Sequence, residues 1–559
     1  MSSVQGRSAK LLLLTAALVT LAVSPTTNYD PISVVKLLVL STCAFTLFSL
    51  WLSQGSTVLS ELGKSEKLFV GGFVFAMFST LMFSGAPIAQ QIFGSFGRNT
   101  GFLAYFSLLV VLVITSSLGN RDFYQGIPKF LIGVTIPMLA YCGIQIAGLD
   151  PIKWSEFATF GTLGNINFLS AFLGLSAVTG FILSFSSNLE KNWRITAIAT
   201  SVISVPVILS TGSIQGFVIL VAGVTFALGL VLLKYRKFLL LLPFSALVLS
   251  GIALTIQGLT NKGILAKFLY QPSVVFRGDY MHAGWRMTLD HPLFGVGLDS
   301  YGDWYRQARG EISTLRTGPE RISNSAHNIF LDISSNGGLP LLFFYLALLG
   351  LALISSIKYL RNLKDIDFNF LALLSAWFAY QIQAAVSINQ LGVGVWGWLF
   401  TGALIGYGKI NSSFPDMAPT IGKGRSAKRR RTQNQIPAKA AVSMIAGSAI
   451  GFSLAFIPWN ADVKYKSALQ KRVIVEMMKS VDSLGSTSFH SELVISAAMS
   501  INAFDQAKET SFRLVAKKPR NFFGWKVISL LPNVTEVERA TALAKLRVLD
   551  PYNPDIPKS

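Results

Sequence analysis

The stretch FLLLLPFSALVLSGIALTI, residues 238–256, decides the fold class. It contains no charged residue, and its length matches the roughly 20 residues that an α-helix needs to cross a hydrocarbon core of about 30 Å. Similar runs recur on both sides of it. Thirteen are found in all, at residues 11–27, 34–52, 68–86, 101–118, 129–148, 167–186, 194–210, 215–233, 238–256, 339–356, 369–388, 391–408 and 441–458.

The composition of the 559-residue chain agrees with a membrane protein. Hydrophobic residues make up 51% and charged residues only 13%, whereas soluble domains carry roughly 25% charged residues. Lipid forces each backbone polar group to be bonded within its own segment, and the runs do not show the short alternating strands of a membrane barrel. The sequence therefore predicts an all-α, polytopic membrane helix bundle of about thirteen transmembrane helices.

Two smaller points concern the beginning of the chain and its cysteines. The first run follows Arg7 and Lys10 and is either a retained helix or a cleaved signal peptide. The weak cleavage pattern after Pro25 favours the retained helix. Cys43 and Cys142 both fall within predicted spans, where we expect them to be small apolar packing residues.

The distribution of basic residues predicts the orientation. The net charge is +21, but the bases gather in loops that alternate with loops almost free of them, which is a topology signal. The positive-inside rule places the basic loops and the amino terminus in the cytoplasm, and residues 257–338 and the tail after 458 outside. The basic block at 423–431 is expected to contact anionic lipid head groups rather than nucleic acid. The basic set contains Lys64, Lys67, Arg121, Lys129, Lys191, Arg194, Lys234, Arg236, Lys237, Lys358, Arg361, Lys364, Lys423, Arg425 and Lys428 to Arg431, and the opposite set only Arg98 and Lys153.

Residues 257–338 concentrate polar chemistry in one outer segment. Guanidinium groups bind phosphate oxygens bidentately, so an excess of arginine over lysine indicates an anion site. The alternative is that the arginines pair with the seven acids of the segment, as we expect for Arg306 and Arg309. The segment holds Arg277, Arg286, Arg306, Arg309, Arg316 and Arg321, only Lys262 and Lys267, and the histidines His282, His291 and His327.

Arg98 is the lone base of a second outer loop, GSFGRNTG at 94–101. An isolated charge at the membrane edge needs a partner. A ligand phosphate and a structural ion pair both satisfy this need, for Arg98 as for Arg277 and Arg286.

The tail after Trp459 has the composition of a soluble helical domain. Leu514, Pro519 and Asn521 recur as Leu546, Pro551 and Asn553, a spacing of 32 residues. Tetratricopeptide repeats have a period of about 34 residues, and residues 489–552 resemble one or two degenerate repeats of that family. A plain small helical domain is the alternative. His490 lies here without a cluster of candidate site residues around it, and we expect it to be incidental.

Four quoted segments point to a family. FRGDYMHAGWRMTLDHPLFGVGLDSY at 276–301 and SAHNIFLDISSNGGL at 325–339 combine an arginine-led segment, Pro-x-x-Gly-x-Gly, His-Asn and Gly-Gly-Leu. This pattern resembles the O-antigen ligase and O-antigen polymerase superfamily of bacterial lipid-linked glycan transferases. GTLGNINF at 161–168 and STGSIQG at 210–216 are weaker echoes, the second without an arginine often present there. The resemblance covers about residues 90–410.

The resemblance implies a GT-C-like membrane glycosyltransferase acting at the bacterial inner (cytoplasmic) membrane in cell-surface polysaccharide biosynthesis. The donor is expected to be a glycan on a polyprenyl diphosphate, and the acceptor a glycan, lipid or protein hydroxyl. Positioned arginines stabilise a departing diphosphate, and a histidine suits a general base. The expected catalytic residues are His327, Arg277 and Arg286, and the expected diphosphate-binding residues are Arg98, Arg321, Asn165 and Asn167.

Several alternatives stay open. A helix cap explains one of the two asparagines as well as substrate binding does. A purely structural role is the alternative for His327. His282 and His291 are expected to be structural, with a metal site beside Asp279 and Asp290 as the alternative; we expect neither metal nor cofactor. A transporter or flippase of lipid-linked sugars would instead place charge near the middle of the membrane. Two further possible functions of the chain are those of a protein O-oligosaccharyltransferase and of a non-catalytic assembly scaffold.

The sequence divides the chain into six parts. They are helices one to nine (1–256), the large outer segment (257–338), helices ten to twelve (339–408), a basic cytoplasmic loop (409–440), helix thirteen (441–458) and an outer helical domain (459–559) that is able to recruit a protein partner.

Overall fold

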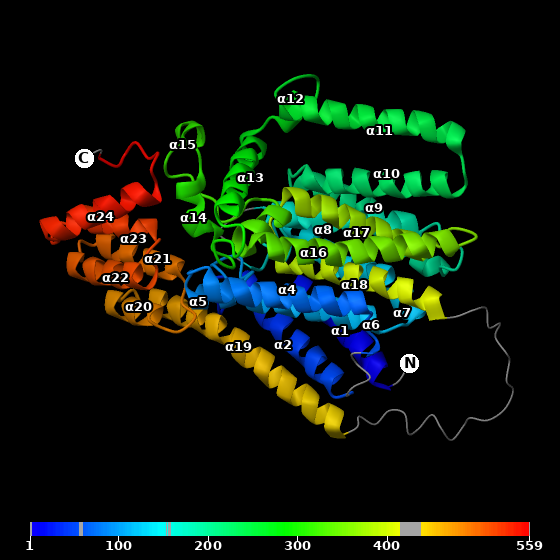
Figure 1. Cartoon of the computed structure of the whole chain (residues 1–559), viewed down its shortest axis with the longest axis horizontal. Coiled ribbons are helices and arrows are strands. Elements are labelled where there is room, and N and C mark those ends of the chain that lie inside the picture. The colour runs from blue at the N-terminus through cyan, green and yellow to red at the C-terminus, as the bar shows by residue number, and fades with distance from the viewer. Residues whose placement is uncertain (1–2, 55–59, 153, 155–157, 414–437, 558–559) are drawn as a thin grey trace.

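The computed structural model describes residues 3–54, 60–152, 154, 158–413 and 438–557. Within these residues the chain is helical, without a strand. Each of the thirteen predicted runs coincides with a helix of one elongated bundle (Figure 1). The helices are α1 (Ser3–Leu21), α2 (Ser33–Leu52), α4 (Lys64–Phe83), α6 (Phe102–Ser117), α7 (Arg121–Ile146), α8 (Ile166–Leu183), α9 (Lys191–Ser210), α10 (Gln215–Lys234), α11 (Phe238–Leu259), α16 (Ile329–Asn362), α17 (Phe368–Val386), α18 (Leu391–Ser413) and α19 (Ala438–Lys471).

The composition of these helices identifies an integral membrane protein. In the described part of the chain, ten helices are long and apolar enough to cross a membrane, and α6 is a shorter apolar helix. The apolar window of α18 is 94% buried, whereas that of α11 is 0% buried. A bare apolar helix such as α11 is unfavourable in water but is covered by lipid in a bilayer. The predicted polytopic, all-α membrane fold is confirmed.

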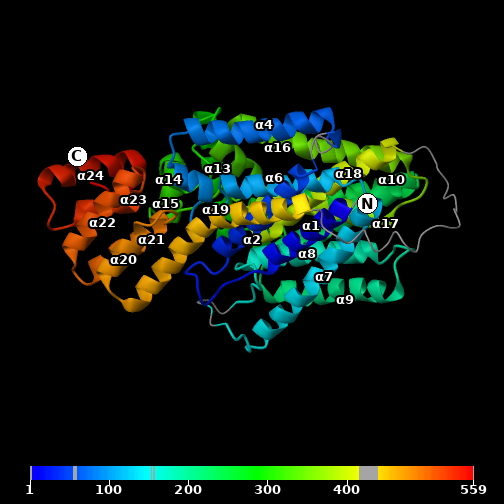
Figure 2. The same ribbon diagram turned by 90° about the horizontal axis from the view of Figure 1, so that it is seen from below.

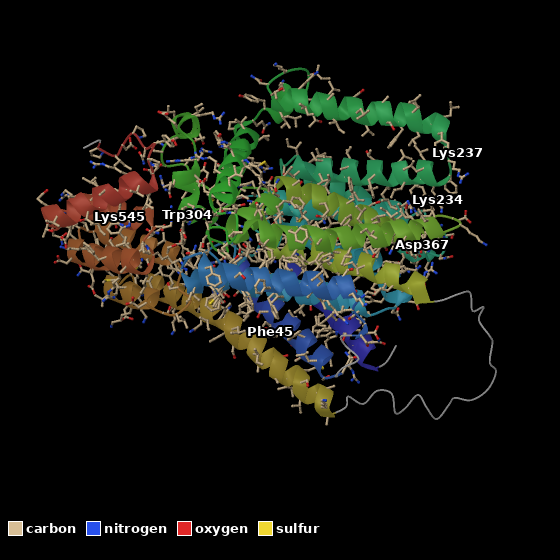
Figure 3. The ribbon with its side chains drawn as sticks, in the orientation of Figure 1. Phe45, Lys234, Lys237, Trp304, Asp367 and Lys545 are labelled. Atoms are coloured by element: carbon tan, nitrogen blue, oxygen red, sulfur yellow. The ribbon has the colours of Figure 1, made fainter. Side chains whose placement is uncertain are left out.

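The two ends of the bundle differ in what they carry. Figure 3 shows Lys234, Lys237 and Asp367 at one end, and Trp304 and Lys545 at the other. The 257–338 segment and the tail share this second end in both views (Figures 1 and 2). The arrangement agrees with the alternation of basic loops, while the side of the membrane that each end faces stays a prediction. The predicted basic block at 423–431 lies outside the described residues.

The 257–338 segment folds into short helices. After α11 come α12 (Ala266–Leu269), α13 (Pro272–Asp290), α14 (Tyr301–Ala308) and α15 (Glu311–Thr317). α16 already begins at Ile329 and is interrupted at Gly338, whose φ is +78°. The part of α16 before this break therefore lies within residues 257–338, and the apolar run follows the break.

The Pro-x-x-Gly-x-Gly turn packs against the break in α16. The N–H of Gly297 donates to the carbonyl of Asn336 at 3.0 Å. A Cβ on Gly338 would lie 2.4 Å from the carbonyl oxygen of Leu293, and its positive φ independently favours glycine. The glycines of this motif thus serve backbone geometry.

The tail continues directly from the last membrane helix. α19 extends to Lys471, past the predicted boundary at 459. The chain then forms α20 (Ile474–Val481), α21 (Ser488–Ser500), α22 (Phe504–Lys517), α23 (Phe522–Leu530) and α24 (Glu536–Leu549). From α21 to α24, each helix packs against the next in sequence, which is how helix–turn–helix arrays bury their apolar faces. The tetratricopeptide-like assignment stays a prediction.

The 32-residue sequence repeat is also a repeat of backbone conformation. α22 and α24 end at Lys518 and Asp550, whose φ and ψ are −136° and 81° in one case and −143° and 74° in the other. The N–H of Lys518 donates to the carbonyl of Leu514 at 2.8 Å, and that of Asp550 to Leu546 at 2.9 Å. The repeated leucine and the residue that closes the helix therefore define equivalent helix ends.

Asp550 joins the tail to the 257–338 segment. Its carboxylate accepts from Arg306 at 3.0 Å and from Arg309 at 2.7 Å. The side chains of Arg309 and Asp550 are both 0% exposed. Arg306 also lies 3.6 Å from Glu320. The two arginines are ion-paired as expected, but their shared partner lies in the tail and not in the 257–338 segment.

Replacing Asp550 with asparagine is expected to loosen the tail. The change leaves Arg309 buried without a countercharge, and removing one partner of a buried ion pair costs about 3–5 kcal/mol. Thermal unfolding of the full chain in detergent should show a lower Tm, and limited proteolysis should cut the tail faster. Asp555→Asn, at an exposed position nearby, is the matched control. Equal Tm values for both variants would contradict the role of Asp550.

Candidate active site

The candidate site lies where α13, the start of α16 and the end of α17 meet. Arg277 of α13 donates from Nη1 to the carbonyl of Val386 at 3.0 Å. Asn328, which caps α16, donates from Nδ2 to the carbonyl of Ala385 at 3.0 Å. The last carbonyls of a helix lack partners within the helix. Here the carbonyls of two consecutive residues, Ala385 and Val386, hold Arg277 next to Asn328. Arg277 therefore also lies next to His327.

Arg277 carries a positive charge without a matching carboxylate. The side chain is half-buried, and within the described residues it makes no ion pair. Burial lowers the pKa of Arg277, but a guanidinium remains protonated at neutral pH. A partly desolvated cation that lacks a countercharge is suited to bind an anionic ligand.

His327 presents an unprotonated imidazole beside this cation. Its ring centroid lies 5.2 Å from that of Tyr280 on α13, and in the described part of the chain no hydrogen bond engages the ring. Burial, followed by the charges of Arg277 and Arg98, lowers the pKa of His327 to about 4. At neutral pH the ring is therefore neutral and able to accept a proton.

A hydrogen-bond network fixes the backbone of His327. Its φ is +53°, a left-handed conformation that is uncommon outside glycine. The N–H of His327 donates to Oγ of Ser325 at 3.0 Å, and this hydroxyl donates to Asp332 at 2.7 Å. The other carboxylate oxygen of Asp332 accepts the N–H of Ala326 at 2.8 Å. Asp332, in the first turn of α16, thus holds the turn that presents the imidazole.

Arg98 belongs to this network. Its guanidinium lies 3.5 Å from Asp299 and 3.4 Å from Asp332, and its side chain is 3% exposed. It also donates to the carbonyl of Asn324. Two carboxylates already balance its charge, which favours the structural ion pair, one of the two alternatives that the sequence left open; the diphosphate-binding role of Arg98 stays a prediction.

The other two predicted arginines lie apart from His327. From Arg277 to Arg286 is nine residues of α13, about two and a half turns at 3.6 residues per turn, so their side chains leave the helix on opposite sides. Arg321 lies over the ring of Phe276, 4.4 Å from its centroid, and is exposed. The structure therefore brings Arg321 to the Arg277 end of α13 and leaves Arg286 on the far side.

The two predicted asparagines stand at the start of α8. The side chain of Asn165 accepts the N–H of Asn167 at 2.8 Å and caps the helix. The side-chain oxygen of Asn167 accepts the hydroxyl of Ser213 at 2.8 Å. The weaker family segments at 161–168 and 210–216 therefore lie side by side. The cap accounts for Asn165, and no acceptor within the described residues engages the amide N–H groups of either side chain.

The remaining histidines of the segment lie elsewhere. His282 is exposed on α13. His291 follows the end of α13 and packs against the ring of Trp304, with centroids 4.5 Å apart. Burial lowers the pKa of His291. Within the described residues, no group of three or more His, Cys, Asp or Glu side chains is placed to hold a metal ion.

Asp299 and Asp332 are the site residues that the sequence did not single out. In the sequence they are two of seven acids in the segment, with nothing to distinguish them. One signal was present for Asp332, because Ser325 and Asp332 flank His327 within the same quoted segment. No local signal marks Asp299, whose carboxylate accepts the N–H groups of Ser95 and Thr100 from the distant 94–101 loop.

Comparison with known proteins gives one family. Residues 198–346 match the family model described as O-Antigen ligase. This stretch includes Arg277, Arg286, Arg321 and His327, and excludes Arg98, both asparagines and the tail. No curated protein matches the chain.

Proposed function

We propose that this chain, a member of the O-antigen ligase and polymerase superfamily by its match at residues 198–346, transfers a glycan from a polyprenyl diphosphate to an acceptor hydroxyl. The reaction is placed on the outer side of the cytoplasmic membrane, with the amino terminus inside and the tail outside. The match supports glycosyl transfer in polysaccharide biosynthesis; the donor, the acceptor and the orientation are part of the proposal.

The observation that carries the proposal is the pair formed by Arg277 and His327. One is a half-buried guanidinium with no ion pair in the described structure, and the other is a neutral imidazole with no hydrogen bond to its ring. Both lie at the end of α17, an apolar helix whose last carbonyls contact the polar 257–338 segment. A lipid-borne diphosphate would arrive at this level of the bundle.

The pair is suited to a single displacement at the anomeric carbon. The acceptor oxygen forms a bond to that carbon as its proton passes to a ring nitrogen of His327. The bond from the anomeric carbon to the diphosphate oxygen breaks, and the leaving polyprenyl diphosphate takes the electron pair. Arg277 stabilises the charge that develops on this oxygen, with Arg321 at the same end of α13. The amides of Asn165 and Asn167 are proposed to bond the sugar or the diphosphate.

Donor binding should strengthen the base. The positive charges of Arg277 and Arg98 contribute to the low pKa of His327. A diphosphate next to Arg277 offsets part of this positive potential, so the pKa of His327 rises towards its ordinary value. The imidazole then becomes a better proton acceptor when the donor is in place.

The low pKa of His327 predicts the pH dependence of kcat/KM, which reports groups of the free enzyme. Protonation removes the base, so activity should be lost on the acid side, near the pKa of about 4 of His327. Arg277→Gln removes one charge that lowers this pKa, so its acid limb should move to higher pH. Initial rates on a lipid-linked donor measure the acid limbs of the wild type and of Arg277→Gln. Samples returned to neutral pH should regain full activity, which shows that the protein was not denatured by acid. A wild-type limb near pH 6.5 that the variant does not move would contradict the argument.

The reaction type is tested with the purified full chain and a lipid-linked oligosaccharide, with and without a candidate acceptor. Longer glycans without an acceptor identify a polymerase, and a new conjugate identifies a ligase or a protein O-oligosaccharyltransferase. Movement of the lipid-linked sugar across vesicles with neither product would identify a flippase and overturn the proposal. Equal rates with and without a chelator are expected of the metal-independent mechanism.

A further inference from the structure

A cleft separates the tail from the membrane helices, away from the candidate active site. It has a volume of ≈ 590 Å³ and lies between α5 (Ile88–Phe93), α20, the 482–488 loop, the start of α21 and the end of α22. Clefts of this size at the junction of two structural units are preferred places for ligands. Nothing in the proposed transfer reaction uses it.

The height of the cleft in the membrane follows from its neighbours. α5 directly follows the candidate span α4, whose last residue, Phe83, is 68% exposed. The 482–488 loop packs on α19 at Ile457. The contact is close, since a Cβ on Gly485 would lie 2.9 Å from Ile457. Trp459 follows Ile457 by two residues on α19. Its ring stacks on that of Phe456, which stacks in turn on Phe452. Aromatic residues at the end of an apolar span mark the head-group level of a bilayer.

The cleft is basic on its tail side. Arg513, Lys517 and Lys518 of the α22 end line it, against one acid, Asp482. Asp482 lies 2.7 Å from Arg513 and 3.3 Å from Lys517, and Arg513 also pairs with Glu509 of its own helix, but all four side chains are 42–62% exposed. Exposed pairs of this kind are weak and easily exchanged for a stronger anion. Hydroxyl groups of the 482–488 loop add further hydrogen-bond donors.

A row of phenylalanines, here called the apolar lane, links the membrane helices α4, α6 and α2, and α4 is followed by α5 at the cleft. Phe78 of α4 lies 4.9 Å from Phe102 of α6, and Phe102 lies 6.2 Å from Phe106. Phe106 in turn lies 5.6 Å from Phe45 of α2, and α2 packs along α19. α4 and α19 both run towards the end of the bundle where the tail lies (Figures 1 and 2). The partly exposed phenylalanines of α4, α6 and α2 form an apolar surface that fits acyl chains.

A basic pocket at head-group level above an apolar lane is the complement of an anionic lipid. We propose that this cleft binds the phosphate of an anionic phospholipid, whose acyl chains lie along α4, α6 and α2. The phosphate lies against Arg513 and Lys517, and the lipid joins the tail to the membrane helices. This proposal does not depend on the proposed glycan transfer.

The test compares two double variants of the full chain. Arg513→Gln with Lys517→Gln removes the basic edge of the cleft, and both positions are exposed, so folding should be preserved. Lys545→Gln with Arg547→Gln removes the same charge from α24, which does not line the cleft. Each protein is reconstituted with phosphatidylglycerol or phosphatidylcholine, and native mass spectrometry counts the retained lipids.

Wild type and the α24 variant should retain one more phosphatidylglycerol than the cleft variant. The affinity of the cleft variant for phosphatidylglycerol should fall about 30-fold, since each of the two bases removed contributes about fivefold. Phosphatidylcholine should be retained equally by all three proteins. Equal retention of phosphatidylglycerol by the three proteins would overturn the proposal. Complete displacement of the lipid by millimolar inorganic phosphate would also overturn it, because the site would then recognise free phosphate.

Discussion

Replacing His327 with asparagine is expected to lower the rate of glycan transfer by about 10²–10⁴-fold, the usual contribution of a general base. Asparagine is the suitable replacement because His327 has a φ of +53°, and asparagine adopts the left-handed conformation more readily than most residues. It cannot accept the acceptor proton at neutral pH. Transfer from a radiolabelled lipid-linked donor by the purified protein measures the loss.

His282→Asn is the matched control for this variant. His282 lies in the same segment but is exposed on α13, and the change should leave the rate within about twofold of wild type, as expected for a surface position. Donor binding by His327→Asn, measured separately, should be nearly unchanged. Full activity of His327→Asn would remove the general base from the mechanism, and equal losses in both variants would point to a defect of folding.

Replacing Arg277 with glutamine is expected to lower the transfer rate by about 10²–10³-fold, the typical effect of removing one donor that stabilises a developing negative charge. Glutamine keeps a polar amide on the side chain but removes the charge and is too short to reach the carbonyl of Val386. Arg277→Lys should recover only part of the rate, since an ammonium lacks the planar fork that grips phosphate oxygens. The loss should appear in kcat as well as in kcat/KM, because the charge grows in the transition state.

Arg286→Gln provides the comparison within the same helix. Its position on the opposite side of α13 leads us to expect a smaller loss than for Arg277→Gln. A loss in Arg286→Gln as large as that in Arg277→Gln would show that the diphosphate contacts both faces of α13, and the assignment of the site to the α17 side would be wrong.

The membrane architecture was predictable because a bilayer imposes one length and one polarity on every span. Residues 238–256 and the twelve other apolar runs each coincide with a helix, since lipid leaves the backbone few other choices. The Pro-x-x-Gly-x-Gly motif likewise predicted a turn, because glycines adopt backbone conformations that other residues avoid.

The partners of the charged residues were not predictable. Arg98 pairs with Asp332, which is 234 residues away in the chain. His490 is expected from the sequence to be incidental, yet it lies 3.1 Å from Asp462, which is 28 residues earlier in the chain. The other oxygen of Asp462 accepts the N–H of Tyr29 from 433 residues away. A sequence shows the sign of each charge, but only the packing of distant helices shows which charge it meets.

The amino-acid sequence alone determined that this chain crosses a membrane many times and that arginine and histidine gather in one segment, because hydrophobic length and local composition are properties of consecutive residues. The tertiary structure alone decided that two carboxylates neutralise Arg98, while Arg277 beside His327 has no ion pair within the part of the chain that the structure describes. The physical reason is that ionic interaction falls off with distance in space, and the distance between residues far apart in the chain is set by how the helices pack.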